Sequence, residues 1–271
     1  MWINTLSRRW YKPSFTGDIH AITSVNNLIV ALVDNELYQH SELNFEPDRI
    51  VLPRNMDMND RSLRDIIVAR NDSKNKDHHT SFCITVASEV MAIFCLNKNE
   101  EDFLNRVEDI TVAYSLDNKL IFDKDLNCRN AIRFLIKDDL KPNLVQTKYR
   151  TPTFVHGGPF ANIAHGTNSV IATDLALKHA DYVVTEDGFG SDLGMQKDLD
   201  VVSPLAELHP TIRALKLHVE MKFDELDKEN IEAVKEGSKN LIKHLKNDIT
   251  SLIFNTRNND TRQINRIEFI L

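Results

Sequence analysis

The sequence predicts an α/β protein in which helices flank a parallel β-sheet. Three consecutive segments carry this prediction: a strand that runs into a glycine turn at 151–158, a helix at 169–180 and a short apolar run at 181–185. Strand, helix and strand in this order are typical of parallel α/β sheets. With 271 residues, of which 42% are hydrophobic, the chain is long enough to bury a sizeable core.

The N-terminal part predicts two helices and a strand. Apolar residues recur at helical spacing over 15–35, and a second, highly charged helix is predicted over 57–70. The apolar run at 49–52 predicts a short strand. Asp18 and His20 lie near the start of the first helix. They are interpreted either as a helix cap and its neighbour or as residues of a functional site.

A polar loop and a buried helix follow. Residues 71–81 are polar, so His78 and His79 are expected to be exposed to solvent rather than to bind a metal. Residues 84–96 are too long and too continuously apolar for a typical strand, so they predict a buried helix. An ionised Glu89 inside that helix would be costly to bury alone. It is therefore expected either to face a polar cleft or to pair with an arginine.

The centre of the chain predicts a hairpin and a third helix. Strands are expected at 109–114 and 120–122, joined by a turn at Asp117 and Asn118, with a helix at 129–138. These elements lead into the glycine-containing segments.

Glycine is scarce, and six of the eight glycines lie between Gly157 and Gly194. They form two loops, HGGPFANIAHG at 156–166 and EDGFGSDLG at 186–194, each of which directly follows a predicted strand. Ligands of open parallel sheets bind at the carboxyl ends of the strands. Both loops are therefore candidates for a ligand site.

The first loop has the features of an anion site. Glycine lets the backbone turn and lets a ligand approach its amides, and the helix that follows presents free N–H groups to a phosphate. A structural glycine turn with a buried Asn and His accounts for the same pattern equally well. The candidate residues are His156, Gly157, Gly158, Pro159, Phe160, Asn162, His165 and Gly166.

The second loop adds carboxylates at the same edge. They would hold a cation, orient an amine or act as a base, and the alternative is a solvated acidic turn that caps the next helix. The residues predicted to line the cleft are Asp18, His20, Glu186, Gly188, Gly190 and Asp192. No metal site is predicted.

Composition argues against several classes of function. The net charge of -7 argues against a general nucleic-acid binder, which needs clustered Lys and Arg. No apolar run reaches the roughly 18–20 residues that a membrane span needs. Cys83, Cys95 and Cys128 show no CxxC spacing, so we expect a reducing cytoplasm and neither a disulfide framework nor a zinc site.

Several collinear segments resemble the formate–tetrahydrofolate ligase family, also called 10-formyltetrahydrofolate synthetase. The most specific is TPTFVHGGPFANIAHGTNSVIAT at 151–173. Supporting segments include FTGDIHAIT at 15–23, ITVASEVMAIFCL at 84–96 and ADYVVTEDGFGSDLG at 180–194. They occur in the order that the family shows and span most of the chain.

The resemblance implies an ATP-dependent carbon–nitrogen ligase of one-carbon metabolism. Formate would attack the γ-phosphate of ATP to give formyl phosphate, and the formyl group would pass to N10 of tetrahydrofolate. The loop 156–166 would lie at the nucleotide and formyl phosphate site, and 186–194 would line the same cleft. The resemblance also implies Mg²⁺, a response to monovalent cations and a homo-oligomer.

The sequence also departs from the family pattern. The family carries a GEGKT-type phosphate loop and an Arg-Glu-Pro-Ser-Leu-Gly-Pro stretch upstream of FTGDIHA, whereas no GxxxxGK[ST] motif occurs in these 271 residues. We therefore expect a partial P-loop NTPase-like parallel sheet without the P-loop strand, in a chain truncated at both ends. Pro204 and Pro210 interrupt a stretch where the family has an apolar strand, which argues against a central strand there.

These departures define the expected domains and leave three interpretations of activity open. The expected parts are an unmatched segment at 1–14, an α/β ligase-like core at 15–219, and a charged helix with a terminal strand at 220–271. The chain is an active ligase, an inactive fragment or pseudoenzyme, or one half of a split enzyme. Without the groups that cradle phosphate, we expect no measurable ligase activity from the chain alone.

Overall fold

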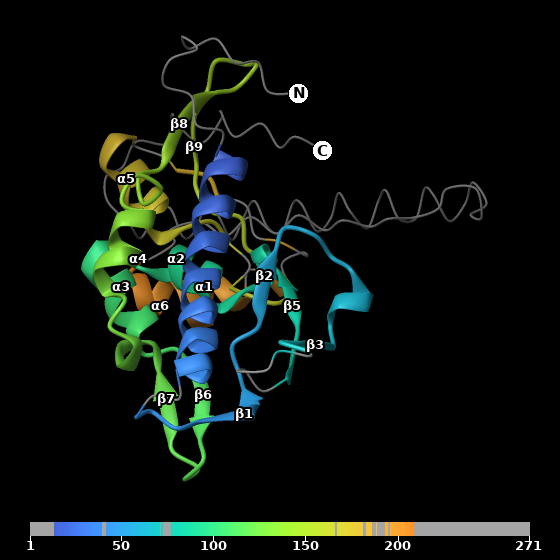
Figure 1. Cartoon of the computed structure of the whole chain (residues 1–271). Coiled ribbons are helices and arrows are strands. Elements are labelled where there is room, and N and C mark those ends of the chain that lie inside the picture. Colours follow the sequence, from blue (N-terminus) through green and yellow to red (C-terminus); the bar gives the residue numbers. More distant parts are fainter. Residues whose placement is uncertain are drawn as a thin grey trace, which may run out of the picture. The chain divides into compact units, whose positions relative to one another are not determined.

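The computed structural model describes residues 14–39, 42–70, 72, 77–165, 167–180, 183–185, 188, 193–194 and 196–208. All of them lie in one compact unit that ends at Leu208. The predicted boundary between 219 and 220 falls outside the described residues. The described residues have a mixed α/β structure of helices and small sheets (Figure 1).

The longest helix of the described residues, α1 (Ser14–Gln39), packs against both the other helices and the strands. In Figure 1 the helices α3 and α4 lie on one side of α1, and the strands β2 and β5 lie on the other. Its buried apolar residues recur every three or four positions, which confirms the predicted helix. They include Ile19, Ile22, Val25, Ile29, Val33 and Leu37.

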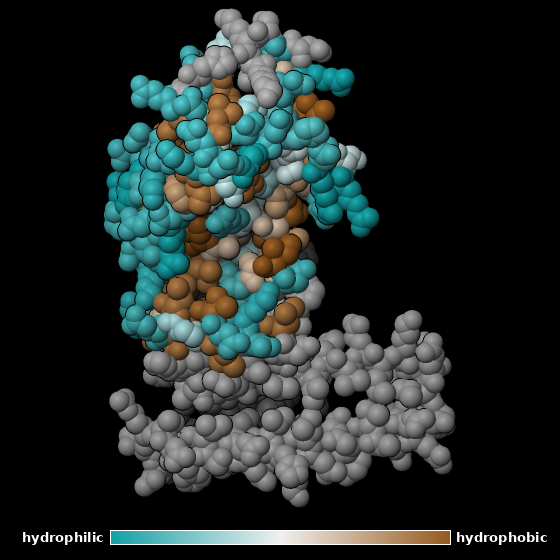
Figure 2. Space-filling model, turned by 90° about the horizontal axis from the view of Figure 1, so that it is seen from below, coloured by the Kyte–Doolittle hydropathy of each residue, from teal (hydrophilic) through white to brown (hydrophobic). Residues whose placement is uncertain are grey.

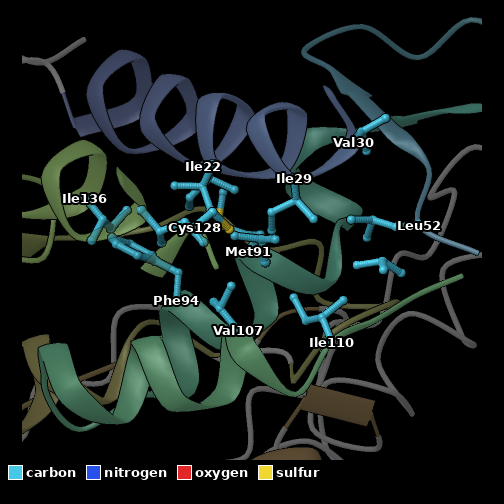
Figure 3. Close-up of a cluster of buried hydrophobic side chains, with 14 of the residues drawn as sticks. Ile22, Ile29, Val30, Leu52, Met91, Phe94, Val107, Ile110, Cys128 and Ile136 are labelled. Carbon is cyan, nitrogen blue, oxygen red and sulfur yellow. The ribbon is translucent and has the colours of Figure 1, made fainter. Parts of the chain in front are cut away.

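Three further helices complete the core. They are α2 (Glu89–Leu96), α3 (Glu100–Glu108) and α4 (Arg129–Ile136). Figure 3 shows Ile22 and Ile29 of α1 next to Met91 of α2, with Phe94 and Val107 below them. The predicted buried helix over 84–96 is confirmed from Glu89 onward, because a short 3₁₀ helix, η2 (Thr85–Ala87), takes its first part.

In the part of the chain that the structure describes, the strands form four small sheets. An antiparallel sheet has the order β1 (Phe45–Ile50), β6 (Thr111–Ser115), β7 (Leu120–Phe122), and β3 (Ile66–Val68) pairs antiparallel with β4 (His78–Thr80). A second hairpin joins β8 (Asn143–Gln146) to β9 (Pro152–Val155). The pair β2 (Arg54–Met56) and β5 (Phe82–Ile84) is parallel. Two 3₁₀ helices, η1 (Arg61–Leu63) and η3 (Asp123–Leu126), connect these elements.

Two N-terminal predictions were wrong. The segment 57–70 is not a helix, because it contains only the single turn η1 followed by β3. Ile66, Ile67 and Val68 are consecutive β-branched residues, which favour a strand over a helix. The segment 71–81 is not entirely an exposed loop either. His78 lies in β4 and is buried with its Nε2 atom 3.7 Å from Asp34 Oδ1, whereas His79 is exposed as predicted.

The predicted strand–helix–strand unit is only partly formed among the described residues. The strand before the glycine turn is present as β9, but its partner is the adjacent β8, to which a tight turn at Thr147–Thr151 connects it. The helix is present as α5 (Val170–His179), capped by Ser169. Residues 183–185 are not a strand, and Val184 is 96% exposed, so the predicted buried strand is wrong at these positions.

The segment after the second glycine loop is helical. A π-helix, η5 (Asp198–Val202), continues into α6 (Ser203–Ala206), with Pro204 in the first turn of α6. Proline suits a helix start because the first N–H groups of a helix have no partner there. The prediction that no central strand forms around Pro204 is confirmed for the described residues.

The surface around the β6–β7 hairpin is partly hydrophobic. Leu116 and Leu120 of this hairpin are exposed. Figure 2 views the chain from below and shows hydrophobic patches among hydrophilic side chains. Of the helices described, none combines the length and the apolar character required to cross a membrane.

Candidate functional site

The first glycine loop starts from a turn that only glycine fits. Gly157 has a φ of +70°, in the left-handed region that side chains disfavour. A Cβ atom there would lie 2.4 Å from Cys95 Sγ and 3.6 Å from the ring of Phe94, both on α2. The close approach of the loop to α2 therefore depends on the missing side chain.

A carboxylate from α1 holds this turn. The backbone N–H of Gly157 donates to Asp18 Oδ2 over 2.7 Å, and Asp18 is buried. The prediction that Asp18 caps α1 was wrong, because α1 begins at Ser14 and Asp18 lies beyond its first turn. Asp18 instead joins two segments that lie 139 positions apart in the sequence. His20, predicted to line the same cleft, is exposed on α1.

The sulfur of Cys95, on α2, packs against Gly157 of the loop. Burial raises the pKa of Cys95 to about 12, against the lowering effect of the Gly158 backbone N–H, and the nearby Asp18 carboxylate raises it further. The thiol is therefore neutral at physiological pH and packs as a small apolar group.

His156 is neutral and bonded on both sides. Its Nε2 atom lies 2.8 Å from the carbonyl oxygen of Asp139, which only accepts hydrogen bonds, so Nε2 carries the proton. Nδ1 is then an acceptor and receives the hydroxyl hydrogen of Ser169 over 2.7 Å. Burial lowers the pKa of His156 to about 4, despite the opposing effect of the Asp139 carbonyl.

The hydroxyl of Ser169 links this network to α5. Its oxygen accepts from the backbone N–H of Ala172 over 3.1 Å, which is the N-cap bond of the helix. His156 and Ser169 therefore fix the start of α5 relative to the end of β9. Both side chains are buried and bonded within the protein, so they shape the loop from inside.

Residues 160–164 form a single exposed turn at the tip of the loop. The N–H of Phe160 donates to the Val86 carbonyl over 2.9 Å, and the N–H of Ala164 donates back to the Phe160 carbonyl over 2.8 Å. Phe160, Asn162 and Ile163 are exposed. The structure thus places Asn162 at the surface and not in the buried position that a purely structural turn would use.

His165 directly follows the turn 160–164 in the sequence. It is only 3% exposed, and neither ring nitrogen has a hydrogen-bond partner of standard geometry. Burial lowers the pKa of His165 to about 4, against backbone groups of Asn168 and Thr167 that favour protonation, and the positive charge of Lys197 lowers it further. The ring is therefore neutral in the folded chain.

The second loop is described only in part. Gly188 is half-buried, whereas Glu186, Gly190 and Asp192, like Gly166 of the first loop, lie outside the described residues. Within the described ranges, no three His, Cys, Asp or Glu side chains come together as metal ligands.

Glu89 is the first residue of α2 and is exposed, so it is not buried inside the helix as predicted, and it lies at the edge of a small hollow. Both polar and apolar residues line the hollow, among them Asn26, Ser88, Val51 and Leu52. Partial burial raises the pKa of Glu89. Among the described side chains, no arginine lies within ion-pair distance of Glu89.

Comparison with known proteins identifies the family. The sequence model of formate--tetrahydrofolate ligase matches residues 12–256, which is most of the chain. This protein belongs to the formate–tetrahydrofolate ligase family. The segments that carried the resemblance, from FTGDIHAIT to EDGFGSDLG, all lie within the match.

Relatives named formate--tetrahydrofolate ligase are about half identical to this chain over the aligned region. One from Thermosipho africanus is 53% identical over 241 residues, which is 86% of this chain and 44% of the relative. Others come from Caldicellulosiruptor saccharolyticus, at 49% over 242 residues, and Pelagibacter ubique, at 50% over 241 residues. The chain spans less than half the length of these relatives.

Sequence reasoning missed two residues that shape the loop. Lys197 donates from Nζ to the carbonyls of Ala161 and Ala164, and Cys95 fills the space under Gly157. Neither belongs to a glycine motif. Only the position of Lys197, three residues after Gly194, would have suggested a link to the site.

Proposed function

We propose that this chain forms the nucleotide and formyl phosphate loop of an ATP-dependent formate–tetrahydrofolate ligase. The observation that carries the proposal is the Gly157 turn, held by Asp18 and closed against Cys95, within a segment that keeps the family's most specific motif. A loop fixed in this way presents its tip without reorganising when a ligand arrives. Such preorganisation is what phosphoryl transfer requires.

The donors of the loop fit an anion at its tip better than at its base. The amides of Gly157 and Phe160 already donate to Asp18 and Val86, and the rings of His156 and His165 are buried. Asn162 lies between His156 and His165 in the sequence and is exposed on the turn 160–164. We therefore assign the anion contact to Asn162 on the turn 160–164, and a supporting role to the buried residues.

The remaining groups of the reaction follow from the family. ATP, formate and tetrahydrofolate are the proposed substrates, and Mg²⁺ would neutralise the charge that develops on the phosphates. Glu186 and Asp192 of the second loop are the proposed carboxylates of the cleft. A monovalent cation and a homo-oligomer are also part of the proposal.

The fold and location that we propose rest on smaller observations. The parallel pair β2–β5 supports a P-loop NTPase-like sheet that is completed by other segments. The free thiols of Cys83, Cys95 and Cys128 support the cytoplasm. We also keep the proposed division into an N-terminal segment to residue 14, a core to 219 and a C-terminal part.

Two other interpretations compete with an active ligase. In one, the chain is an inactive fragment or pseudoenzyme, and in the other it is half of a split enzyme whose phosphate loop comes from another polypeptide. Both are favoured by the same fact, namely that no GxxxxGK[ST] motif occurs in these 271 residues. They differ in whether this chain supports the ligase reaction when another polypeptide supplies the phosphate loop.

A reassembly assay separates the interpretations. The purified chain is incubated with ATP, Mg²⁺, formate and tetrahydrofolate, alone and together with the parts of the Thermosipho africanus relative outside the matched region. Formation of 10-formyltetrahydrofolate is followed spectrophotometrically. The matched control replaces this chain by the relative's own matched segment.

We expect no product from the chain alone and product from the reassembled mixture. Product from the chain alone would refute the expectation that it is inactive by itself. If the control mixture forms product and the mixture with this chain does not, the pseudoenzyme interpretation holds and the proposed function is wrong.

A further inference from the structure

Lys197 binds the exposed turn 160–164 of the first loop, although it belongs to a different segment of the chain. Its Nζ atom donates to the carbonyl of Ala161 over 2.8 Å and to the carbonyl of Ala164 over 2.7 Å. Both carbonyls belong to the turn 160–164, and Lys197 immediately precedes η5. One ammonium group therefore joins the segment after the second glycine loop to the first glycine loop.

The contact is strong for electrostatic reasons. Hydrogen bonds from a charged donor are roughly twice as strong as neutral ones. The turn 160–164 is a single helical turn, so its last carbonyls have no helical partner, and a cation satisfies them as it does at a helix C-terminus. Lys197 is only partly exposed, so water screens the contact incompletely.

The charge of Lys197 also acts on the loop's buried histidine. It lowers the pKa of His165, in the same direction as burial. Because His156 and His165 are both neutral, the positive charge that contacts the turn comes from Lys197.

We propose that Lys197 is a positioning residue for the candidate site. It fixes the turn 160–164, and through this turn it sets the position of Asn162, without contacting the ligand itself. The anchoring of the turn stands on the two hydrogen bonds alone. Its consequence for anion binding rests on the proposed function.

The first experiment measures the anchoring without any ligand. Amide hydrogen exchange of Ala164, whose N–H closes the turn on Phe160, is compared in the full chain and in Lys197→Met, which keeps an unbranched side chain but removes its donors. We expect exchange at Ala164 to become about ten-fold faster. The amide of Met91 in α2 should be unchanged, and Lys197→Arg should restore most of the protection.

The matched control is Lys178→Met, which removes the same charge from the exposed side of α5, where Lys178 pairs with Asp174. This variant should leave Ala164 unchanged. If Lys197→Met exchanges like the unmodified chain, or if Lys197→Arg loses as much protection as Lys197→Met, the proposal is overturned.

The second experiment titrates inorganic phosphate and follows the amide resonances of Asn162 and its neighbours. We expect the dissociation constant to rise about three-fold or more in Lys197→Met and to stay close to the original value in Lys178→Met. An equal response of all three proteins would overturn the role of Lys197 in binding. If the unmodified chain shows no response at the loop, the proposed anion contact fails, and hydrogen exchange at Ala164 still decides the anchoring.

Discussion

Replacing Gly157 by alanine tests the central geometry of the loop. The new Cβ would lie 2.4 Å from Cys95 Sγ, and the residue would keep a φ of +70°. An L-residue in the left-handed region costs about 1–2 kcal/mol, and overpacking a buried contact costs about 1–3 kcal/mol more. We therefore expect Gly157→Ala to lower the free energy of unfolding by about 2–5 kcal/mol.

A second substitution separates the two contributions. Cys95→Ala removes the sulfur that the new Cβ would strike, so in the double variant the overpacking should vanish and the backbone strain should remain. The free energies come from urea unfolding followed by circular dichroism, arranged as a double-mutant cycle. We expect a coupling of about 1–3 kcal/mol in favour of the double variant.

Two results would refute this reasoning. One is a Gly157→Ala variant as stable as the unmodified chain, which would mean that the turn does not press against α2. The other is an additive cycle, which would place the whole loss in the backbone and none in the contact with Cys95.

The remaining predictions concern Asp123 and Ser169. Burial raises the pKa of Asp123 to about 6, against the thiol of Cys128, which donates to it. Because the folded state holds this proton more tightly than the unfolded state, Asp123 lowers stability by up to roughly 3 kcal/mol as the pH rises from 4 to 7. His156 has a lowered pKa and acts in the opposite direction, so the measurement is the difference in thermal unfolding between the unmodified chain and Asp123→Asn at each pH. That difference should grow in favour of Asp123→Asn with rising pH, and a constant difference would contradict the assignment. Ser169→Ala removes the cap of α5 and the donor to His156, so it should lower the free energy of unfolding by about 1–3 kcal/mol in urea. Ser24→Ala on α1 is the control, since Ser24 only bonds to a carbonyl of its own helix.

The sequence was informative where local pattern decides structure. The apolar spacing in α1, the hairpin turn at Asn118 and the helix predicted at 169–180 all act over a few residues, and the structure has each of them. The charged segment 57–70 misled because its run of β-branched residues, Ile66, Ile67 and Val68, favours a strand. The partner of β9 was also missed, since the alternation in a strand does not say which neighbour it pairs with.

The sequence by itself determined the family, the two glycine loops and the absence of a lysine-bearing phosphate motif in these residues, because each is written in consecutive letters. Only the tertiary structure decided what the loop residues touch. Asp18, Cys95 and Lys197 reach the loop from three separate segments, and hydrogen bonds and packing between such segments depend on distances in space that no spacing along the chain encodes.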